Sequence, residues 1–262
     1  MMRSLARPFL AALLALVAAA QFAPPVQANT WWQPHGIISW QMQFSGRIDT
    51  AVVADAYDID AFETSAALVT KLHNLGRHVV CYIDAGSWEN WRPDAGDYPA
   101  AVKGKTMDGW PGERWLDIRR IDVLRPILNS RLDMCAARGF DGVEFDNVDG
   151  YSNNTGFPLT ASDQLAFDRW LANAGHAHGL GVGLKNTPSL AVKLEPSFDF
   201  SIVEQCVQYR ECSSFAPFLN AKKPMLDIEY SRSPTEFCAK AAKLGFFAMK
   251  KRLELTAWRR IC

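Results

Sequence analysis

Short apolar stretches that read as β-strands recur along the chain and alternate with stretches of helical periodicity. The strand-like stretches, rich in β-branched and aromatic residues, are residues 36–42, 51–58, 78–86, 142–147, 181–186, 200–206, 224–230 and 246–251. The helical stretches are residues 61–75, 121–138, 160–178 and 234–244. Near-continuous apolar strands that alternate with helices predict a parallel sheet covered by helices. Eight such strands fit a single α/β domain, a parallel eight-stranded (β/α)8 TIM-type barrel, whose usual size is about 250 residues.

The alternative α/β architecture is an open, doubly wound sheet. Such a sheet usually carries a Gly-rich phosphate-binding turn after its first strand, and residues 36–46 (GIISWQMQFSG) contain no such turn. No Ser/Gly/Pro-rich linker and no internal repeat divides the chain. We therefore expect residues 29–262 to form one barrel domain.

The first 28 residues read as an export signal. Arg3 and Arg7 precede an apolar run at residues 9–20, which is too short to span a bilayer, and residues 26–28 (VQA) form a small-x-small cleavage site. We expect cleavage after Ala28 and a secreted or periplasmic protein. The formal net charge of +0 excludes the strongly basic surface of a nucleic-acid-binding protein, and no later apolar run is long enough for a membrane span. We expect a monomer without a membrane or nucleic-acid partner.

All six cysteines follow the predicted cleavage site. An even number of cysteines in an exported chain predicts three disulfide bonds. Zinc binding is the competing interpretation, but the sequence has no C-x-x-C motif, and His176 and His178, two apart in a predicted helix, point in different directions.

The barrel itself selects among the possible cysteine pairs. Cys81 points outward from the third strand, toward the following helix, which carries Cys135. Two cysteines flank a short loop after the sixth strand, and the last two lie in a late helix and at the chain end. The predicted pairs are Cys81–Cys135, Cys206–Cys212 and Cys238–Cys262.

Six of the predicted strands begin with apolar residues and end with polar or charged ones. The polar residues at these ends are Asp58, Asp60, Tyr82, Asp84, Glu144, Asp146, Lys185, Asn186, Glu204, Gln205, Asp227 and Glu229. A single acidic residue after a strand is most often the N-cap of the next helix. Helix capping does not explain, however, why a tyrosine, a lysine and a glutamine also occur at the ends of these strands. Since the carboxyl ends of barrel strands form the mouth that holds the active site, we predict a site there.

Alternation along the strands aims several of these side chains at the mouth. Residues two apart face the same way, so Glu144 shares one face with Asp146, and Tyr82 shares one with Asp84. Carboxylates that lie this close must be paired, hydrogen-bonded or partly protonated, which is typical of acid–base chemistry. Two carboxylates from different strands that face one cleft are the equipment of glycoside hydrolysis.

Other chemistries have weaker support. The sequence has no G-x-S-x-G motif for a serine nucleophile, and the cysteines are predicted to be oxidised. A metal site of Asp and Glu side chains is an alternative, but it lacks a histidine companion, so we expect neither a metal nor a cofactor. Aromatic rings stack on sugar faces, although core packing is the competing role for any single Trp. The candidate rings are Trp31, Trp32, Trp40, Tyr57, Trp88, Trp91, Trp110, Trp115 and Tyr151.

Several motifs occur in a specific order over nearly the whole of residues 29–262. They are AVVADAYDID (51–60), VVCYIDAGSWENWRPD (79–94), RWLDIR (114–119), GFDGVEFDNVDGY (139–151), GLKN (183–186) and VEQC (203–206). Together they resemble glycoside hydrolase family 114, the endo-α-1,4-polygalactosaminidases. The resemblance implies a (β/α)8 barrel and endo-hydrolysis of α-1,4-linked galactosamine polymers with retention of configuration. It also implies that Asp146, after the fourth strand, and Glu204, after the sixth, are the catalytic pair.

Galactosamine polymers are cationic when deacetylated, so we expect acids at the mouth to pair with substrate ammonium groups. The residues predicted to bind this polysaccharide are Trp40, Asp58, Asp60, Tyr82, Asp84, Glu144, Asn147, Asp149, Tyr151, Lys185, Asn186, Gln205 and Glu229. Among these, Lys185 is expected to lower the pKa of a neighbouring carboxylate and keep the nucleophile ionised.

Two other functions stay open from the sequence. One is a hydrolase on the same barrel that acts on another α-linked or amino-sugar polymer, because mouth loops vary freely on this fold. The other is a non-catalytic sugar-binding barrel, which would need neither Asp146 nor Glu204.

Overall fold

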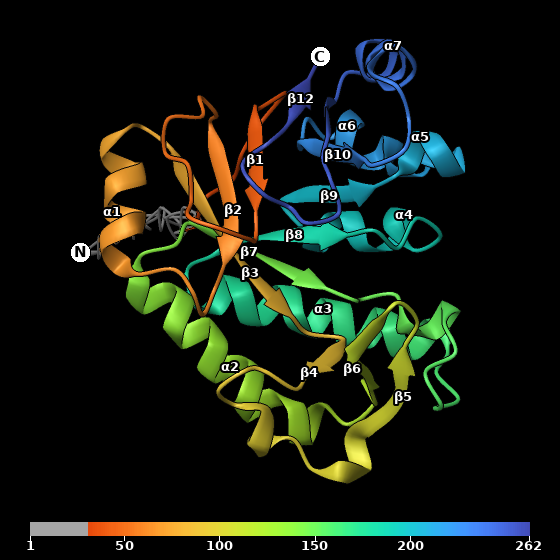
Figure 1. Ribbon diagram of the computed structural model, residues 1–262. Coiled ribbons are helices and arrows are strands. Elements are labelled where there is room, and N and C mark those ends of the chain that lie inside the picture. The colour runs from red at the N-terminus through yellow and green to blue at the C-terminus, as the bar shows by residue number, and fades with distance from the viewer. Residues whose placement is uncertain (1–30) are drawn as a thin grey trace, which may run out of the picture.

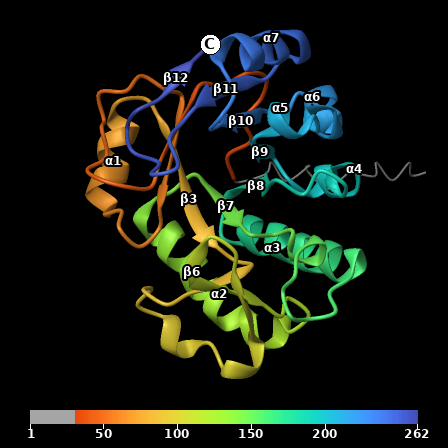
Figure 2. The same cartoon turned by 45° about the vertical axis from the view of Figure 1, so that its right-hand side comes forward.

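The computed structural model describes residues 31–262, so the predicted signal peptide and its cleavage site lie outside the described residues. A nine-stranded sheet curls around a central axis, and helices cover its outer face (Figure 1 and Figure 2). In spatial order its strands are β1 (Trp40–Gln43), β2 (Ala56–Asp60), β3 (His78–Asp84), β7 (Gly142–Asp146), β8 (Gly181–Lys185), β9 (Phe200–Glu204), β10 (Met225–Glu229), β11 (Phe247–Lys250) and β12 (Arg260–Ile261). All neighbours are parallel except β11 and β12. The eight predicted strands are confirmed, and β12 is an addition.

The seam between the first and last parallel strands differs from the expected closed ladder. Among residues 31–262, no ladder joins β1 to β11, and β12 occupies the free edge of β11. Residues 252–261 bridge the seam instead. The Gln41 amide donates to the Ala257 carbonyl at 3.1 Å, and the Phe44 N–H donates to the Leu255 carbonyl at 2.9 Å. Strands β1 and β11 have four residues each, which leaves little length for a further ladder.

Apolar side chains fill the inside of the curled sheet below the mouth. They are Trp40, Met42, Ala56, Val80, Phe200, Ile202, Leu226, Ile228 and Met249. A Cβ at Gly183 would come within 2.3 Å of the Phe200 ring, so glycine in β8 makes room for this aromatic side chain. Trp40 is completely buried in this inner core, which corrects the expectation that it contacts substrate.

The helices form an outer layer, and a second apolar core lies between them and the sheet. The predicted long helices are confirmed as α1 (Ala66–Asn74), α2 (Ile121–Arg138), α3 (Ala161–Ala177) and α7 (Pro234–Leu244). Capping boxes start two of them, Thr160 with Asp163 for α3 and Ser233 with Glu236 for α7. Shorter helices are α4 (Ala191–Leu194), α5 (Cys206–Tyr209) and α6 (Ala216–Asn220), with single turns η1 (Ala95–Asp97), η2 (Ala100–Val102), η3 (Gly150–Ser152), η4 (Glu195–Ser197) and η5 (Cys212–Phe215).

An antiparallel sheet between β3 and α2 was not predicted. Its strands are β4 (Ser87–Glu89), β6 (Trp110–Leu116) and β5 (Lys103–Met107), in that spatial order. We call residues 87–116 the insert. Its β5–β6 turn is Asp108-Gly109, and Gly109 has φ 83°. An Asp-Gly pair between two strands is a strong hairpin signal, but the polar residues of β5 obscured the strand.

All three predicted disulfide pairs are confirmed: Cys81–Cys135, Cys206–Cys212 and Cys238–Cys262. The first joins β3 to α2 on the outside of the sheet, the second closes the loop after β9, and the third fastens the chain end to α7.

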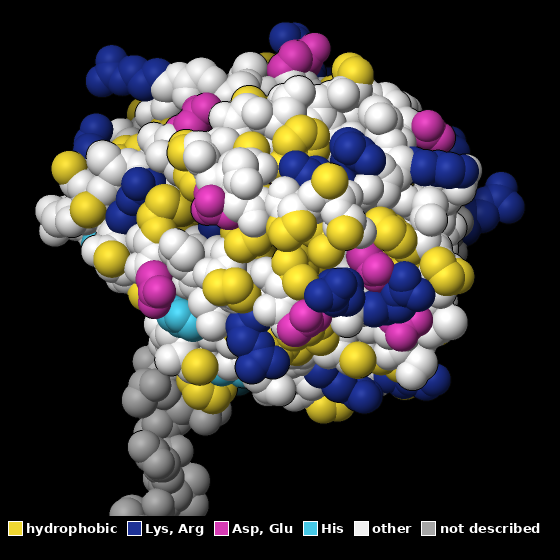
Figure 3. All heavy atoms as spheres, turned by 90° about the horizontal axis from the view of Figure 1, so that it is seen from below, with side chains coloured by type: hydrophobic (Ala, Val, Ile, Leu, Met, Phe, Trp, Pro, Cys, Tyr) yellow, Lys and Arg dark blue, Asp and Glu magenta, His cyan; other side chains and the backbone are white. Residues whose placement is uncertain are grey.

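Within residues 31–262, no helix is both long enough and apolar enough to cross a membrane. On the face shown in Figure 3, basic, acidic and apolar side chains are interspersed.

Candidate active site

A cavity of about 670 Å³ opens at the carboxyl ends of the parallel strands. We call this end of the molecule the mouth. The insert and residues 253–255 supply its outer walls. Nine of the residues predicted for the site line it: Asp60, Tyr82, Asp146, Asn147, Asp149, Lys185, Asn186, Glu204 and Gln205. The location agrees with the usual place of an active site on such a sheet.

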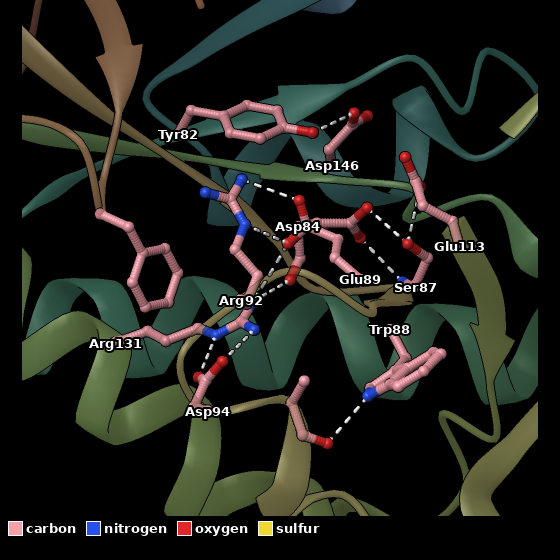
Figure 4. Close-up of polar contacts among 12 residues, drawn as sticks. Tyr82, Asp84, Ser87, Trp88, Glu89, Arg92, Asp94, Glu113, Arg131 and Asp146 are labelled. Atoms are coloured by element: carbon pink, nitrogen blue, oxygen red, sulfur yellow. Dashed lines mark hydrogen bonds and ion pairs between the residues drawn. The ribbon is translucent and has the colours of Figure 1, made fainter. Parts of the chain in front are cut away.

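Asp146, the last residue of β7, has its carboxylate between three donors. Lys185 Nζ lies 3.0 Å and the Asn147 backbone nitrogen 2.8 Å from Oδ1. The Tyr82 hydroxyl donates to Oδ2 at 2.9 Å (Figure 4). Burial by itself raises the pKa of Asp146, but the Lys185 charge and the three hydrogen bonds outweigh burial, and the net pKa is lowered. Asp146 is therefore an ionised carboxylate at neutral pH.

Lys185, at the end of β8, is shared by three carboxylates. Its Nζ lies 2.9 Å from Glu144 Oε1, 3.0 Å from Asp146 Oδ1 and 3.6 Å from Glu204 Oε2. Burial lowers the pKa of Lys185, but the three carboxylates raise it well above its ordinary value. The ammonium therefore stays charged and holds the acids together.

Glu204, at the end of β9, faces the same ammonium. The Tyr230 hydroxyl donates to its Oε1, and its side chain is 26% exposed, close to the 21% of Asp146. Burial, followed by the Glu204 charge, raises the pKa of Tyr230, so its hydroxyl remains a donor. Both carboxylates are thus fixed by the protein and open to the cavity.

The backbone turns sharply after each of these three charged residues. Asn147, Asn186 and Gln205 have φ values of 59°, 48° and 60°, in the left-handed region that non-glycine residues rarely adopt. Each such residue costs about 1–3 kcal/mol, and strain of this kind concentrates at functional sites. The turns lead the chain away from the mouth and leave the charged side chains pointing into it. The Asn186 side chain also accepts the Glu204 N–H at 2.9 Å.

Asp84 is a buried acid that positions Asn147. It accepts the Ser87 N–H at 2.7 Å and the Ser87 hydroxyl at 2.6 Å (Figure 4). It also accepts the Asn147 amide at 2.6 Å. The backbones approach closely here, since a Cβ at Gly86 would come within 1.8 Å of the Asn147 carbonyl oxygen. Burial and then neighbouring acids raise the pKa of Asp84 well above its ordinary value. Ser87 Oγ is also 2.9 Å from Glu113, so one hydroxyl proton is shared between two acids.

A second buried acid lies one layer below the mouth. Asp58 points inward from β2, and neither of its carboxyl oxygens meets a donor among residues 31–262. Burial and then the Glu144 charge raise the pKa of Asp58 well above its ordinary value. One oxygen of Glu144 likewise meets no donor in the described chain. A protonated Asp58 satisfies this arrangement, because its O–H then donates to Glu144.

Two arginines tie the insert to the rest of the fold (Figure 4). Arg92 lies 2.7 Å from both Glu89 and Asp60, and Arg131 of α2 lies 2.7 Å from Asp94. Arg92 therefore neutralises Asp60, which corrects the expectation that this acid is free for a substrate ammonium.

Several predicted binding residues lie off the cavity. The structure buries Asp58, Asp84, Glu144 and Glu229, and none of them lines the cavity, so they support neighbouring groups. Glu229 faces outward from β10 and accepts the N–H groups of Val207 at 2.8 Å and Gln208 at 3.3 Å. The Tyr151 hydroxyl is hydrogen-bonded to the Ser189 hydroxyl.

The candidate aromatic residues divide in the same way. Trp91, Trp110 and Trp115 line the cavity. Trp31 and Trp32 stack on His176 and His78 instead, at the amino ends of the strands.

Tyr230 was not among the predicted site residues, although alternation along β10 predicts that its side chain faces the mouth. Leu226 and Ile228 belong to the inner core, so residues at even numbers face inward and Tyr230 reaches the mouth while Glu229 points away. Glu113 was missed because the insert was not recognised.

A curled parallel sheet whose carboxyl edge presents two carboxylates, from β7 and β9, beside one ammonium has the architecture and the site of a glycoside hydrolase. Among glycoside hydrolases, the family model of Glycoside-hydrolase family GH114 matches residues 21–262 of this chain. The chain belongs to this family.

Known proteins resemble the chain to different degrees. The crystal structure of Aspergillus fumigatus Ega3 in complex with galactosamine superposes with a TM-score of 0.83 and 38% identity, covering 88% of this chain and 97% of that one. The glycoside hydrolase domain of PelA from Pseudomonas aeruginosa has a TM-score of 0.68 at 15% identity, over 85% of this chain and 97% of that one, and this likeness shows the fold alone. An uncharacterised protein of Deinococcus radiodurans is 28% identical over 211 residues, which span 70% of this chain and 65% of that protein.

Proposed function

We propose that the protein is a secreted or periplasmic glycosidase that cleaves α-1,4-linked galactosamine-containing polysaccharide in endo fashion, with Asp146 as nucleophile and Glu204 as acid/base. The observation that carries the proposal is the Lys185 ammonium shared by both carboxylates. Asp146 Oδ1 and Glu204 Oε2 lie 3.0 Å and 3.6 Å from the same nitrogen, so by adding these distances the two oxygens are at most about 6.6 Å apart. Retaining enzymes separate their carboxyls by about 5–5.5 Å and inverting ones by about 6.5–9.5 Å, so this bound favours retention.

In the first step, an Asp146 oxygen attacks the anomeric carbon while Glu204 gives its proton to the departing glycosidic oxygen. The lowered pKa of Asp146 keeps the nucleophile ionised. Tyr82 and Asn147 orient its carboxylate through hydrogen bonds, so one conformation is presented to the substrate.

In the second step, Glu204 removes a proton from water, which attacks the glycosyl ester and frees Asp146. Ester formation removes the Asp146 charge, so Lys185 is then shared by Glu144 and Glu204 alone. The Lys185 ammonium then lies beside Glu204 while this residue acts as the base.

The charge of the cavity supports a cationic substrate. The acids on its lining are Asp60, Glu63, Glu89, Asp108, Glu113, Asp146, Asp149, Glu204 and Glu254. Arg92 and Lys185 are the basic residues on that lining, and both are ion-paired with acids. An excess of negative charge in a cleft attracts ammonium groups. The likeness to the Ega3 complex with galactosamine points to the same class of sugar.

Alongside this, we interpret the sheet as a (β/α)8 barrel whose seam is closed by residues 252–261, and the protein as a monomer. Two alternatives keep the fold and change the function: a hydrolase of another α-linked or amino-sugar polymer, and a non-catalytic sugar-binding barrel.

Release of soluble sugar from three polymers separates these functions: deacetylated galactosamine polymer, its fully acetylated form, and chitosan. We expect release mainly from the first, with the α-anomer formed first in an NMR time course. Release from chitosan alone would favour a hydrolase of another amino-sugar polymer. If the protein binds the polymer without releasing sugar, and Asp146→Asn binds it equally well, a non-catalytic sugar-binding barrel would be favoured.

A further inference from the structure

The insert forms one wall of the cavity and carries side chains that the proposed chemistry does not use. Eight of the residues that line the cavity lie between positions 87 and 116. The proposed catalytic carboxylates lie on β7 and β9, outside this segment. Because both carboxylates and the insert line the same cavity, a polymer bound at the carboxylates would also contact side chains of the insert.

Two tryptophans on this wall are unusually exposed. Trp91 is 55% exposed and Trp110 is 54% exposed, and both line the cavity. Large aromatic side chains left half in water at a cavity commonly mark a binding surface.

Local packing sets both rings on one face of the hairpin. The Asn90 N–H donates to the Gly112 carbonyl at 3.0 Å, which places Trp91 beside the start of β6. A Cβ at Gly112 would come within 2.6 Å of the Trp91 ring, so this ring lies on the face of β6 toward which position 112 points. Trp110 is two residues before Gly112 and therefore faces the same way.

The wall also offers an exposed acid that has no cationic partner among the described residues, Asp108. Arg92 neutralises Glu89 and Asp60. Asp108, in the turn before Trp110, takes part in no ion pair within the described part of the chain and lines the cavity. Glu113 lies on the other face of β6 and accepts the Ser87 hydroxyl at 2.9 Å. An amino-sugar unit presents an apolar C–H face and an ammonium group, which match an indole ring and a carboxylate.

We propose that Trp91 and Trp110 form a sugar-binding subsite away from the scissile bond, where pyranose units of an amino-sugar polymer stack on the indoles and direct ammonium groups to Asp108. This inference rests on the proposed function and adds where the rest of the polymer binds. The subsite supplies affinity for long chains and leaves the bond-breaking steps to the carboxylates around Lys185.

The test compares Trp91→Ala and Trp110→Ala with wild type on long deacetylated galactosamine polymer and on the shortest oligomer that wild type cleaves. We expect kcat/KM on the polymer to fall about fivefold for each substitution, mainly through KM, with the oligomer value changed less than about twofold. Trp110→Phe keeps a ring and should restore most of the loss. Tyr209→Ala is the matched control, because Tyr209 is a 59% exposed aromatic residue of α5 outside the cavity lining.

Equal losses on polymer and oligomer would overturn the subsite, since the tryptophans would then support only the catalytic centre. Unchanged kinetics in both alanine variants would also overturn it while leaving the proposed function intact. If wild type does not cleave the polymer, the proposed function fails, and retention in native gels that contain galactosamine polymer still decides the subsite. Retention of wild type and Tyr209→Ala but not of the two alanine variants would support it, and equal or absent retention of all four would refute it.

Discussion

The curled sheet carries partly buried acidic side chains at both of its ends, and their surroundings differ. At the amino-terminal edge, Asp141 precedes β7 and accepts the N–H of Val79, the second residue of β3, at 2.7 Å. Its carboxylate also lies 2.8 Å from His73 Nε2 and 3.4 Å from His78 Nδ1. This acid meets a backbone donor and two imidazoles.

The same arrangement recurs two strands further along the chain. Asp199 precedes β9 and accepts the Val182 N–H of β8 at 2.8 Å. It also lies 2.8 Å from His176 Nε2 and accepts the Trp31 indole N–H at 3.2 Å. We call the surroundings of Asp141 and Asp199 the floor. Each floor acid joins two neighbouring strands, and its own carboxylate is paired with side-chain and backbone donors.

At the mouth, by contrast, one ammonium serves three carboxylates. Lys185 lies within 3.6 Å of Glu144, Asp146 and Glu204. Burial raises the pKa of Asp146, but Lys185 and hydrogen bonds outweigh it and leave this pKa lowered, whereas burial dominates one layer below and raises the pKa of Asp58. Acids with separate pKa values in one site are the requirement for acid–base catalysis, whereas satisfied acids stabilise a fold.

The largest expected effect comes from neutralising one acid at each end. Asp146→Asn and Glu204→Gln should each lower turnover at least about a thousandfold, because each removes a group that we propose to react with the substrate. The melting temperature should change less, since each amide has the size of the acid that it replaces and both side chains are open to the cavity. Asp199→Asn is the matched control: it should lower the melting temperature and preserve activity per folded molecule. Substantial turnover in either mouth variant would show that the wrong residue is named.

Removing the shared cation tests whether Lys185 tunes the mouth. Lys185→Met should lower kcat/KM about a hundredfold and move the acid limb of its pH profile upward. The sign follows from Lys185 lowering the pKa of Asp146: without the ammonium, that pKa rises, and the nucleophile is ionised only at higher pH. Lys185→Arg keeps the charge and should keep the limb near its wild-type position. A pH profile that does not shift in Lys185→Met would contradict the tuning role.

The floor should contribute stability that depends on pH. Burial raises the pKa of Asp141, but hydrogen bonds from the two histidines and the Val79 amide leave it lowered below 3.8. A lowered folded-state pKa stabilises the protein above about pH 4, and this contribution disappears as the pH falls through the folded value. Asp141→Asn should therefore cost about 1–3 kcal/mol at pH 7 and less near pH 3, measured by urea unfolding. An equal cost at both pH values would contradict this account.

The smallest expected effect is the response to salt. Exposed charges are screened beyond about 10 Å at 0.1 M salt, so affinity for a cationic polymer should fall severalfold between low and high salt. The melting temperature should respond less, because the floor contacts are short and partly buried. Fully acetylated polymer, which lacks the ammonium groups, should show little salt response in the same titration. Equal hydrolysis of both polymers would end the charge-recognition account.

Local pattern was enough for much of this protein. Periodicity located the eight parallel strands and four long helices, since burial of one face imposes a repeat that a single segment displays. Alternation aimed Tyr82, Asp84, Glu144 and Asp146 inward, and the barrel order led to the three disulfide pairs. The polar ends of the strands located the mouth.

Tertiary structure decided how deep each acid lies, because alternation fixes the face of a strand but not its height relative to its neighbours. Register pairs Asp84 with Asp146 and Tyr82 with Glu144, so Glu144 lies one layer below the mouth and holds Lys185, while Asp146 reaches the cavity. The seam made by residues 252–261 and the wall made by the insert likewise depend on contacts between distant segments. Such contacts leave no periodic signal within one stretch of chain, so only the folded structure reveals them.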